Sequence, residues 1–177
     1  MTKKILYVGA KYDYGDKNRG LSYEHRNFHQ PLQSWCVKQG WEFPDYDFYT
    51  RGQEIGLDLM TEELREVARR ERPTLLFSVL VDFHLDPRHE VFSDIGKTGE
   101  TTTLHWFCDD HWRFDNYTRH IAQNFHFVTT TASSAMPKYA EIGLADRVIK
   151  TQWACNHELY TLYDIPQDID ISFAGAP

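Results

Sequence analysis

The central apolar run of the chain reads Thr74-Leu75-Leu76-Phe77-Ser78-Val79-Leu80-Val81. It has the length of a strand, and an almost continuous series of apolar side chains is typical of a strand buried on both faces of a parallel sheet. A helical pattern opens at Thr61 with acidic residues in its first turn, carries arginines near its end and is stopped by Pro73. A helix that leads into a buried strand predicts one βαβ unit.

The same alternation extends to the amino terminus. Residues 5–9 predict a first strand, a polar loop follows, and residues 23–39 have helical periodicity. Ser22 is placed to cap the start of this helix and Gly40 to end it, while Pro31 should kink or shorten it. Strand, loop and helix thus form the first unit of the sheet.

Strands that alternate with helices on this scale predict an α/β fold with a doubly wound, mainly parallel, Rossmann-like sheet. We interpret residues 1–156 as one Rossmann-like domain. Residues 157–177 are interpreted as a linker and the start of a second domain, whose first strand would lie at 170–175. The further elements that we expect are strands over 43–49, 101–108, 125–131 and 147–151, and helices over 87–95, 116–123 and 134–142.

Charge and composition exclude several classes of protein. The chain has 26 acidic and 19 basic residues, and a net charge of −7 opposes binding to polyanionic nucleic acid. No apolar run approaches the ~20 residues that cross a bilayer, and the amino terminus lacks the pattern of a secretory signal. Three widely spaced cysteines indicate neither a disulfide framework nor a zinc knuckle. We therefore expect a cytoplasmic protein without a membrane span.

The loop after the first expected strand runs from residue 9 to residue 20 and contains three glycines. It lacks both the G-x-G-x-x-G spacing of dinucleotide sites and the G-x-x-x-x-G-K-[ST] spacing of phosphate loops. One interpretation is a mobile loop that contacts substrate, with Arg19 or Arg26 pairing with an anionic group. A solvated connector with no ligand is an equally good interpretation.

The run Cys108-Asp109-Asp110-His111-Trp112-Arg113-Phe114-Asp115 follows another expected strand. Ligands of open parallel sheets bind beyond the carboxyl ends of strands, so this run is the strongest candidate site. One carboxylate would act as a general base or hold sugar hydroxyls, and Arg113 would hold the other. Alternatively, Asp110 caps the next helix, and Arg113 and Asp115 form ordinary surface pairs.

Other chemistries find less support in the sequence. His105 and Cys108 lie in an expected strand, where alternate side chains face opposite ways, so they cannot converge with Asp109, Asp110 and His111 on one metal ion. His25 and His29 have the spacing of a zincin motif, but Arg26 stands in place of its glutamate. The hydroxyl-rich loop 129–134 suits helix capping better than anion binding. The geometry of these histidines and Cys108 leads us to expect no metal. No nucleophile motif is present, so we also expect no covalent catalysis.

Five segments together resemble the CgeB-like (spore maturation protein) glycosyltransferases, over nearly the whole chain. The most specific is the run Asp109-Asp110-His111-Trp112-Arg113-Phe114-Asp115. One departure is His157, where the resemblance leads us to expect a proline, a change that affects the linker and not the cleft. The complete set is Lys4-Ile5-Leu6-Tyr7-Val8-Gly9, Gly20-Leu21-Ser22-Tyr23, Trp106 to Asp115, Val128-Thr129-Thr130-Thr131 and Trp153-Ala154-Cys155-Asn156.

The resemblance implies the amino-terminal, acceptor-binding half of a GT-B glycosyltransferase, which faces a second Rossmann-like domain across a cleft. It implies transfer of a sugar from a nucleotide sugar, as co-substrate, to an acceptor hydroxyl, with no metal or other cofactor. Asp109 or Asp110 would be the base and Arg113 its orienter. We expect this half alone to be inactive. The residues expected to bind substrates are Tyr12, Gly15, Arg19, Gly20, Arg26, Trp112, Asp115 and Thr131.

Two interpretations from other classes remain open at this point. The chain is alternatively a non-catalytic binding or regulatory module derived from a glycosyltransferase. A small nucleotide-binding domain of flavodoxin-like type is a third interpretation, although no loop carries a recognisable phosphate fingerprint. Neither the donor sugar, the acceptor nor the stereochemistry of transfer follows from the sequence.

Overall fold

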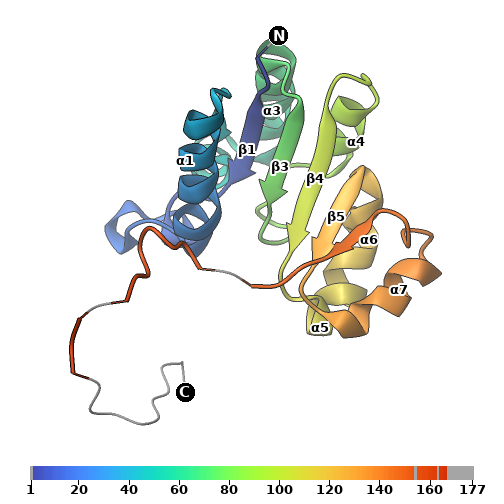
Figure 1. The fold of residues 1–177 in the computed structure, drawn as a ribbon. Coiled ribbons are helices and arrows are strands. Elements are labelled where there is room, and N and C mark those ends of the chain that lie inside the picture. Colours follow the sequence, from blue (N-terminus) through green and yellow to red (C-terminus); the bar gives the residue numbers. More distant parts are fainter. Residues whose placement is uncertain (1, 154, 163, 167–177) are drawn as a thin grey trace.

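The computed structural model describes residues 2–153, 155–162 and 164–166. Within these residues all strands are parallel and form a single six-stranded sheet in the order β2-β1-β3-β4-β5-β6 (Figure 1). The predicted α/β fold with a Rossmann-like sheet is therefore confirmed. The strands are β1 (Ile5–Gly9), β2 (Asp45–Tyr46), β3 (Leu75–Val79), β4 (Thr102–Phe107), β5 (Phe127–Thr130) and β6 (Val148–Lys150).

Helices lie on both faces of this sheet, so it is doubly wound. The α-helices are α1 (Gln30–Gln39), α2 (Phe48–Ile55), α3 (Leu57–Glu71), α4 (Glu90–Gly96), α5 (Asp110–Arg113), α6 (Arg119–Ile121) and α7 (Met136–Glu141). Short 3-10 and π turns join them: η1 (Asp13–Gly15), η2 (Lys17–Arg19), η3 (His25–His29), η4 (Phe114–Thr118), η5 (Ala122–Asn124) and η6 (Ser133–Ala135).

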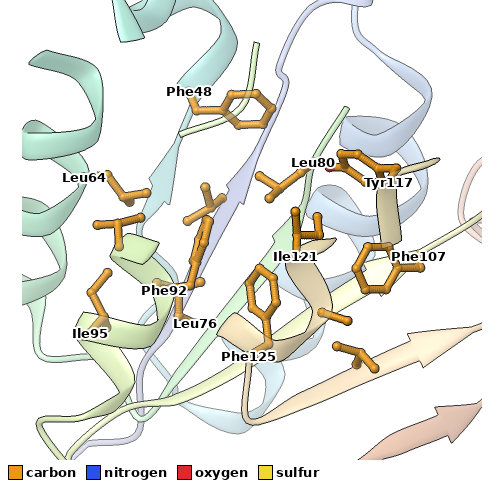
Figure 2. Close-up of a cluster of buried hydrophobic side chains, with 14 of the residues drawn as sticks. Phe48, Leu64, Leu76, Leu80, Phe92, Ile95, Phe107, Tyr117, Ile121 and Phe125 are labelled. Atoms are coloured by element: carbon orange, nitrogen blue, oxygen red, sulfur yellow. The ribbon is translucent and has the colours of Figure 1, made fainter. Parts of the chain in front are cut away.

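The larger part of the core lies between the sheet and helices α2 to α7. Leu76 of β3, Phe92 of α4 and Phe125 are buried there, and the rings of Phe92 and Phe125 are 4.7 Å apart (Figure 2). Burying one such aromatic or aliphatic side chain stabilises the fold by roughly 1.5–3 kcal/mol. The many side chains of this cluster hold the strands in register.

Helix α1 covers the opposite face, and only over part of the sheet. Tyr7 of β1, Phe77 of β3 and Cys36 of α1 form a second, smaller core. Phe127 of β5 and Ile149 of β6 point to the same face but are 41% and 49% exposed. Every connection after β3 moves in one direction along the sheet, so right-handed crossovers place its helices on the other face.

Several predicted element boundaries are wrong. The strand expected over 43–49 has two residues, because Asp47 accepts a hydrogen bond from the Thr50 N–H (3.3 Å) and so begins α2 at Phe48. Helix α3 begins before Thr61, at Leu57, and the helix expected at 116 already begins at Asp110. The strand expected over 170–175 lies outside the described residues.

Two further properties bear on the class of protein. In the described part of the chain, no helix combines the length and the apolar character that crossing a bilayer requires. The strand order β2-β1-β3-β4-β5 is that of flavodoxin-like sheets, with β6 added at the edge. Since one fold serves many functions, this order does not decide among the three interpretations, and the site must do so.

Candidate functional site

The topology points to the carboxyl ends of β1 and β3. After β1 the chain passes to α1 on one face, and after β3 it passes to α4 on the other. Ligands of open α/β sheets bind in the crevice that such a reversal creates. We use the term carboxyl edge for the loops that border it, residues 10–24, 80–89 and 108–113.

Asp109 lies at this edge, directly after the end of β4. Its backbone carbonyl accepts hydrogen bonds from the N–H groups of Trp112 (3.1 Å) and Arg113 (2.9 Å), which start α5. Its carboxylate is half-buried, and among the described residues it has one side-chain neighbour at hydrogen-bond distance, the Cys108 thiol at 3.7 Å. Burial, together with the Asp109 charge, raises the pKa of Cys108 to about 12. The thiol is therefore protonated at neutral pH, while the Asp109 carboxylate is available to a ligand.

Asp110 has the opposite environment. It is 2% exposed, and its two carboxylate oxygens accept hydrogen bonds from the hydroxyls of Thr118 (2.6 Å) and Tyr139 (2.7 Å). Burial, followed by the charge of Asp110, raises the pKa of Tyr139. Asp110 thus connects α5 to η4 and α7 through hydrogen bonds. Its side chain does not cap the helix, and it does not reach the surface where a substrate would bind.

Arg113 does not hold either carboxylate. Its Nη2 donates to the carbonyl oxygen of Val81 at 2.7 Å, and its guanidinium lies 4.4 Å from the ring centroid of Tyr117. The orienting role that we expected for this residue is therefore absent from the structure. Beside Leu80, Asp109 and Arg113 there is a cavity of about 10 Å³, which is room for no more than one water molecule.

Asp86, which sequence reasoning missed, organises the loop after β3. It is 2% exposed and accepts hydrogen bonds from the N–H groups of Val81 (2.7 Å) and Asp82 (3.1 Å) and from the Tyr117 hydroxyl (2.6 Å). His89 approaches it at 3.3 Å. No pattern in the sequence separates Asp86 from other loop acids, because its donors come from a later helix and from the loop itself.

The loop after β1 brings four of the predicted residues together. Tyr12 pairs with Leu21 as an isolated bridge, and Arg19 forms an ion pair with Asp13 at 2.8 Å. Gly15 has a φ of 69° and packs so closely on Tyr49 that a side chain would collide with that ring. These contacts make the loop an ordered element.

The end of that loop leads into the first helix. The Ser22 hydroxyl accepts from the His25 N–H at 3.0 Å and donates to the Ala10 carbonyl at 2.6 Å, so the predicted cap is confirmed. Arg26 is exposed, and its guanidinium lies 3.8 Å from the position that a Cβ at Gly20 would occupy. Arg26 and Gly20 are therefore neighbours at the carboxyl edge.

The remaining predicted residues have separate positions. Trp112 is 62% exposed, next to Asp109. The Thr131 hydroxyl donates to the Cys108 carbonyl at 2.9 Å, which fastens the ends of β4 and β5. Asp115 instead forms ion pairs with Lys138 (2.6 Å) and Arg119 (3.3 Å). Asp115 is thus a surface ion-pair residue, as the alternative interpretation had it.

The segment after β6 returns to the first helix and borders the edge (Figure 1). Asn156 is 2% exposed, donating from its backbone N–H to Asn27 Oδ1 (3.1 Å) and from its side chain to the Arg26 carbonyl (2.8 Å). The ring of Trp153 lies 6.0 Å from Tyr23 and 6.1 Å from Trp106. Sequence reasoning did not assign a role to these residues, since their partners are more than 45 positions away.

The histidines provide no metal site in the part of the chain that the structure describes, where no group of three potential ligands occurs. His105 is fully buried and its Nδ1 lies 2.9 Å from the Ser78 hydroxyl. The rings of His25 and His29 stack with centroids 4.0 Å apart. Burial lowers the pKa of His105 to about 3 and that of His25 to about 4, so both are neutral at pH 7.

The arrangement places the Asp109 carboxylate, exposed aromatic rings and Arg113 at the carboxyl edge, with Arg26 next to Gly20. Within the run 108–115, Asp109 is the carboxylate that combines a position at this edge with freedom from internal hydroxyl and cation partners. Such a group can accept a proton from a bound hydroxyl. No protein-family model and no curated protein sequence matches the chain.

Proposed function

We propose that the chain is the acceptor-binding half of a two-domain glycosyltransferase that transfers a sugar from a nucleotide sugar to an acceptor hydroxyl. The observation that carries the proposal is the Asp109 carboxylate, which lies just beyond the end of the central strand β4 and has, among the described residues, no hydrogen-bond donor stronger than a thiol. Trp112 beside it offers an exposed ring face. Aromatic faces of this kind stack on the apolar faces of sugar rings.

In the proposed reaction the acceptor hydroxyl lies within hydrogen-bond distance of Asp109. Its oxygen forms a bond to the anomeric carbon of the donor while the bond from that carbon to the oxygen of the nucleoside diphosphate breaks. The diphosphate leaves with the electron pair of the broken bond, and the hydroxyl proton passes to the Asp109 carboxylate. Asp110 takes no part, since both of its oxygens have internal partners.

The shape of the edge favours a second wall supplied by another domain. Ligand pockets enclose roughly 300–1,000 Å³, whereas the cavity beside Asp109 has about 10 Å³. A surface this shallow suits one side of a cleft. In this proposal a second Rossmann-like domain, following residue 157, holds the nucleotide sugar.

The test is a transfer assay on the full-length gene product. Nucleotide sugars are combined with a panel of glycans and small hydroxylated acceptors, and glycosylated products are identified by mass spectrometry. Asp109→Asn should lower turnover by about 10²- to 10⁴-fold, the usual contribution of a general base. The matched control is Asp94→Asn, because Asp94 is half-exposed and pairs with Arg65 away from the edge. Unchanged turnover in Asp109→Asn would exclude Asp109 as the base.

A further inference from the structure

Arg113 carries a charge that the described residues do not neutralise. Among them, no carboxylate lies within ion-pair distance of its guanidinium, although the side chain is half-buried. The hydrogen bond to the Val81 carbonyl uses one of its five N–H donors. A half-buried cation loses hydration, so an anionic partner would stabilise it.

Among the described acids near Arg113, Asp109 is not within ion-pair distance of the guanidinium, and three others already have other partners. Asp110 accepts from two hydroxyls, Asp86 accepts from two backbone N–H groups and Tyr117, and Asp115 pairs with Lys138 and Arg119. On the outer surfaces, by contrast, arginines have acidic partners: Arg51 with Glu63, Arg72 with Glu100, and Arg88 with Asp58. Among the described residues Arg147 also lacks an acidic partner, but its guanidinium donates to three backbone carbonyls, whereas that of Arg113 donates to one.

The fold places this guanidinium at the carboxyl ends of β3 and β4, and β3 is one of the two strands that border the crevice. Val81, which accepts its hydrogen bond, follows β3 by two residues, and the last residues of β1 and β3 are register partners, Gly9 with Val79. The ring of Tyr117 lies 4.4 Å from the guanidinium and restricts its orientation. The site of the charge is therefore fixed before any ligand binds.

We propose that Arg113 binds an oxyanion, a carboxylate or a phosphate monoester, on the molecule that occupies the carboxyl edge. The inference rests on the proposed function in one respect, namely that this molecule is the acceptor. The acceptor would then be an acidic sugar. A planar guanidinium matches the two oxygens of such a group with parallel hydrogen bonds, which an ammonium group does not. Arg26, exposed beside Gly20, adds a second positive charge on the β1 side.

The experiment is a calorimetric titration of the full-length protein, without nucleotide sugar, with glucuronate, glucose 6-phosphate and glucose. At least one of the two acidic sugars should bind 10-fold or more tightly than glucose, and the tighter of the two identifies the anion. Arg113→Gln should weaken that binding by roughly 10- to 100-fold, the effect of losing a charge-assisted hydrogen bond. Arg119→Gln makes the same change of charge on the same helical stretch, and it should leave the affinity unchanged because Arg119 pairs with Asp115.

Thermal unfolding of each variant checks that the loss of the Val81 contact has not unfolded the loop. If Arg113→Gln does not fold, Arg113→Lys decides the question, since it keeps the charge and removes the planar pair of donors. The acidic sugar that binds the wild type more tightly should then bind Arg113→Lys several-fold more weakly than the wild type. Equal affinity for all three sugars, no binding of either acidic sugar, or an unchanged affinity of Arg113→Lys for the tighter-binding acidic sugar would overturn the assignment.

The two proposals fail in different ways. Transfer to neutral acceptors without any preference for acidic sugars would refute the role of Arg113 and leave the glycosyltransferase proposal standing. Binding of acidic sugars that depends on Arg113, in a protein that transfers no sugar, would refute the transferase and support the anion site.

Discussion

Asp109 and Asp110 are adjacent in the chain and have opposite surroundings. Asp109 lies at the carboxyl edge with a thiol as its neighbour, and Asp110 is enclosed by the hydroxyls of Thr118 and Tyr139. The sequence identified the run that contains both. It could not separate them, because the two hydroxyls come from positions 8 and 29 residues further along the chain.

Asp110→Asn should destabilise the protein. The new amide group would face a hydroxyl donor that Asp110 now satisfies as an acceptor, so one buried hydrogen bond is lost and a polar group is left unpaired. We expect the free energy of unfolding to fall by about 1–3 kcal/mol, measured by urea denaturation. Asp115→Asn is the control, since its exposed ion pairs contribute about 0–1 kcal/mol. Equal stability of Asp110→Asn and the wild type would contradict the structural role.

Pro31 leaves a backbone carbonyl of the first helix free to bind the segment that follows β6. Helix α1 is preceded by the π turn η3, in which the Gln30 N–H donates to the His25 carbonyl. The next residue, Pro31, has no N–H to offer the Arg26 carbonyl. That carbonyl accepts from the Asn156 side chain instead, 130 residues away. The sequence predicted a disturbed helix at Pro31, but not this partner.

Asn156→Ala should therefore loosen the segment that crosses the carboxyl edge. Three hydrogen bonds to the Arg26 carbonyl, Asn27 and Glu158 involve Asn156, and two of them need its side chain. We expect faster cleavage within 151–160 in limited proteolysis, by roughly 5-fold or more, with the midpoint of thermal unfolding little changed. Gln152→Ala, at an exposed position in the same segment, should be cleaved like the wild type. Equal cleavage rates in all three proteins would show that Asn156 does not anchor the segment.

The predicted positions of strands and helices were correct where the apolar periodicity was strong, and they were wrong where a polar side chain determined the boundary. The buried runs of β1, β3 and β4 were found at nearly their observed positions. The expected strand over 43–49 failed because the Asp47 side chain starts a helix inside an alternating pattern. Local patterns do not reveal which of several polar residues will cap.

For the molecule as a whole, the sequence led to a parallel sheet covered by helices but not to the order of its strands. Strand order depends on the direction that each crossover takes, and β2 and β3 lie on opposite sides of β1. This arrangement creates the crevice at β1 and β3 and brings Arg113, from the β4 side, to the Val81 carbonyl. The sequence therefore predicted only some of the residues that form the site.

Stability should fall as the pH is lowered from about 6.5 to about 4. The folded-state pKa values of His105 (about 3) and His25 (about 4) lie below the usual 6.5, so the unfolded chain binds protons first. Each histidine then removes roughly 1.4 kcal/mol of stability per pH unit across this range. His105→Asn, which keeps a hydrogen-bonding group toward Ser78, should flatten the slope of unfolding free energy against pH by about that amount. An unaltered slope would contradict a neutral, buried His105.

In the proposed reaction the carboxyl edge presents Asp109 to an acceptor hydroxyl. The most direct measurement is a crystal structure of the full-length protein with the acceptor that the transfer assay identifies. We predict a hydroxyl oxygen within about 2.6–3.2 Å of an Asp109 carboxylate oxygen. An acceptor bound instead in the pocket of about 520 Å³ between α3 and α4, lined by Arg65, Ala68 and Ile95, would contradict the claim.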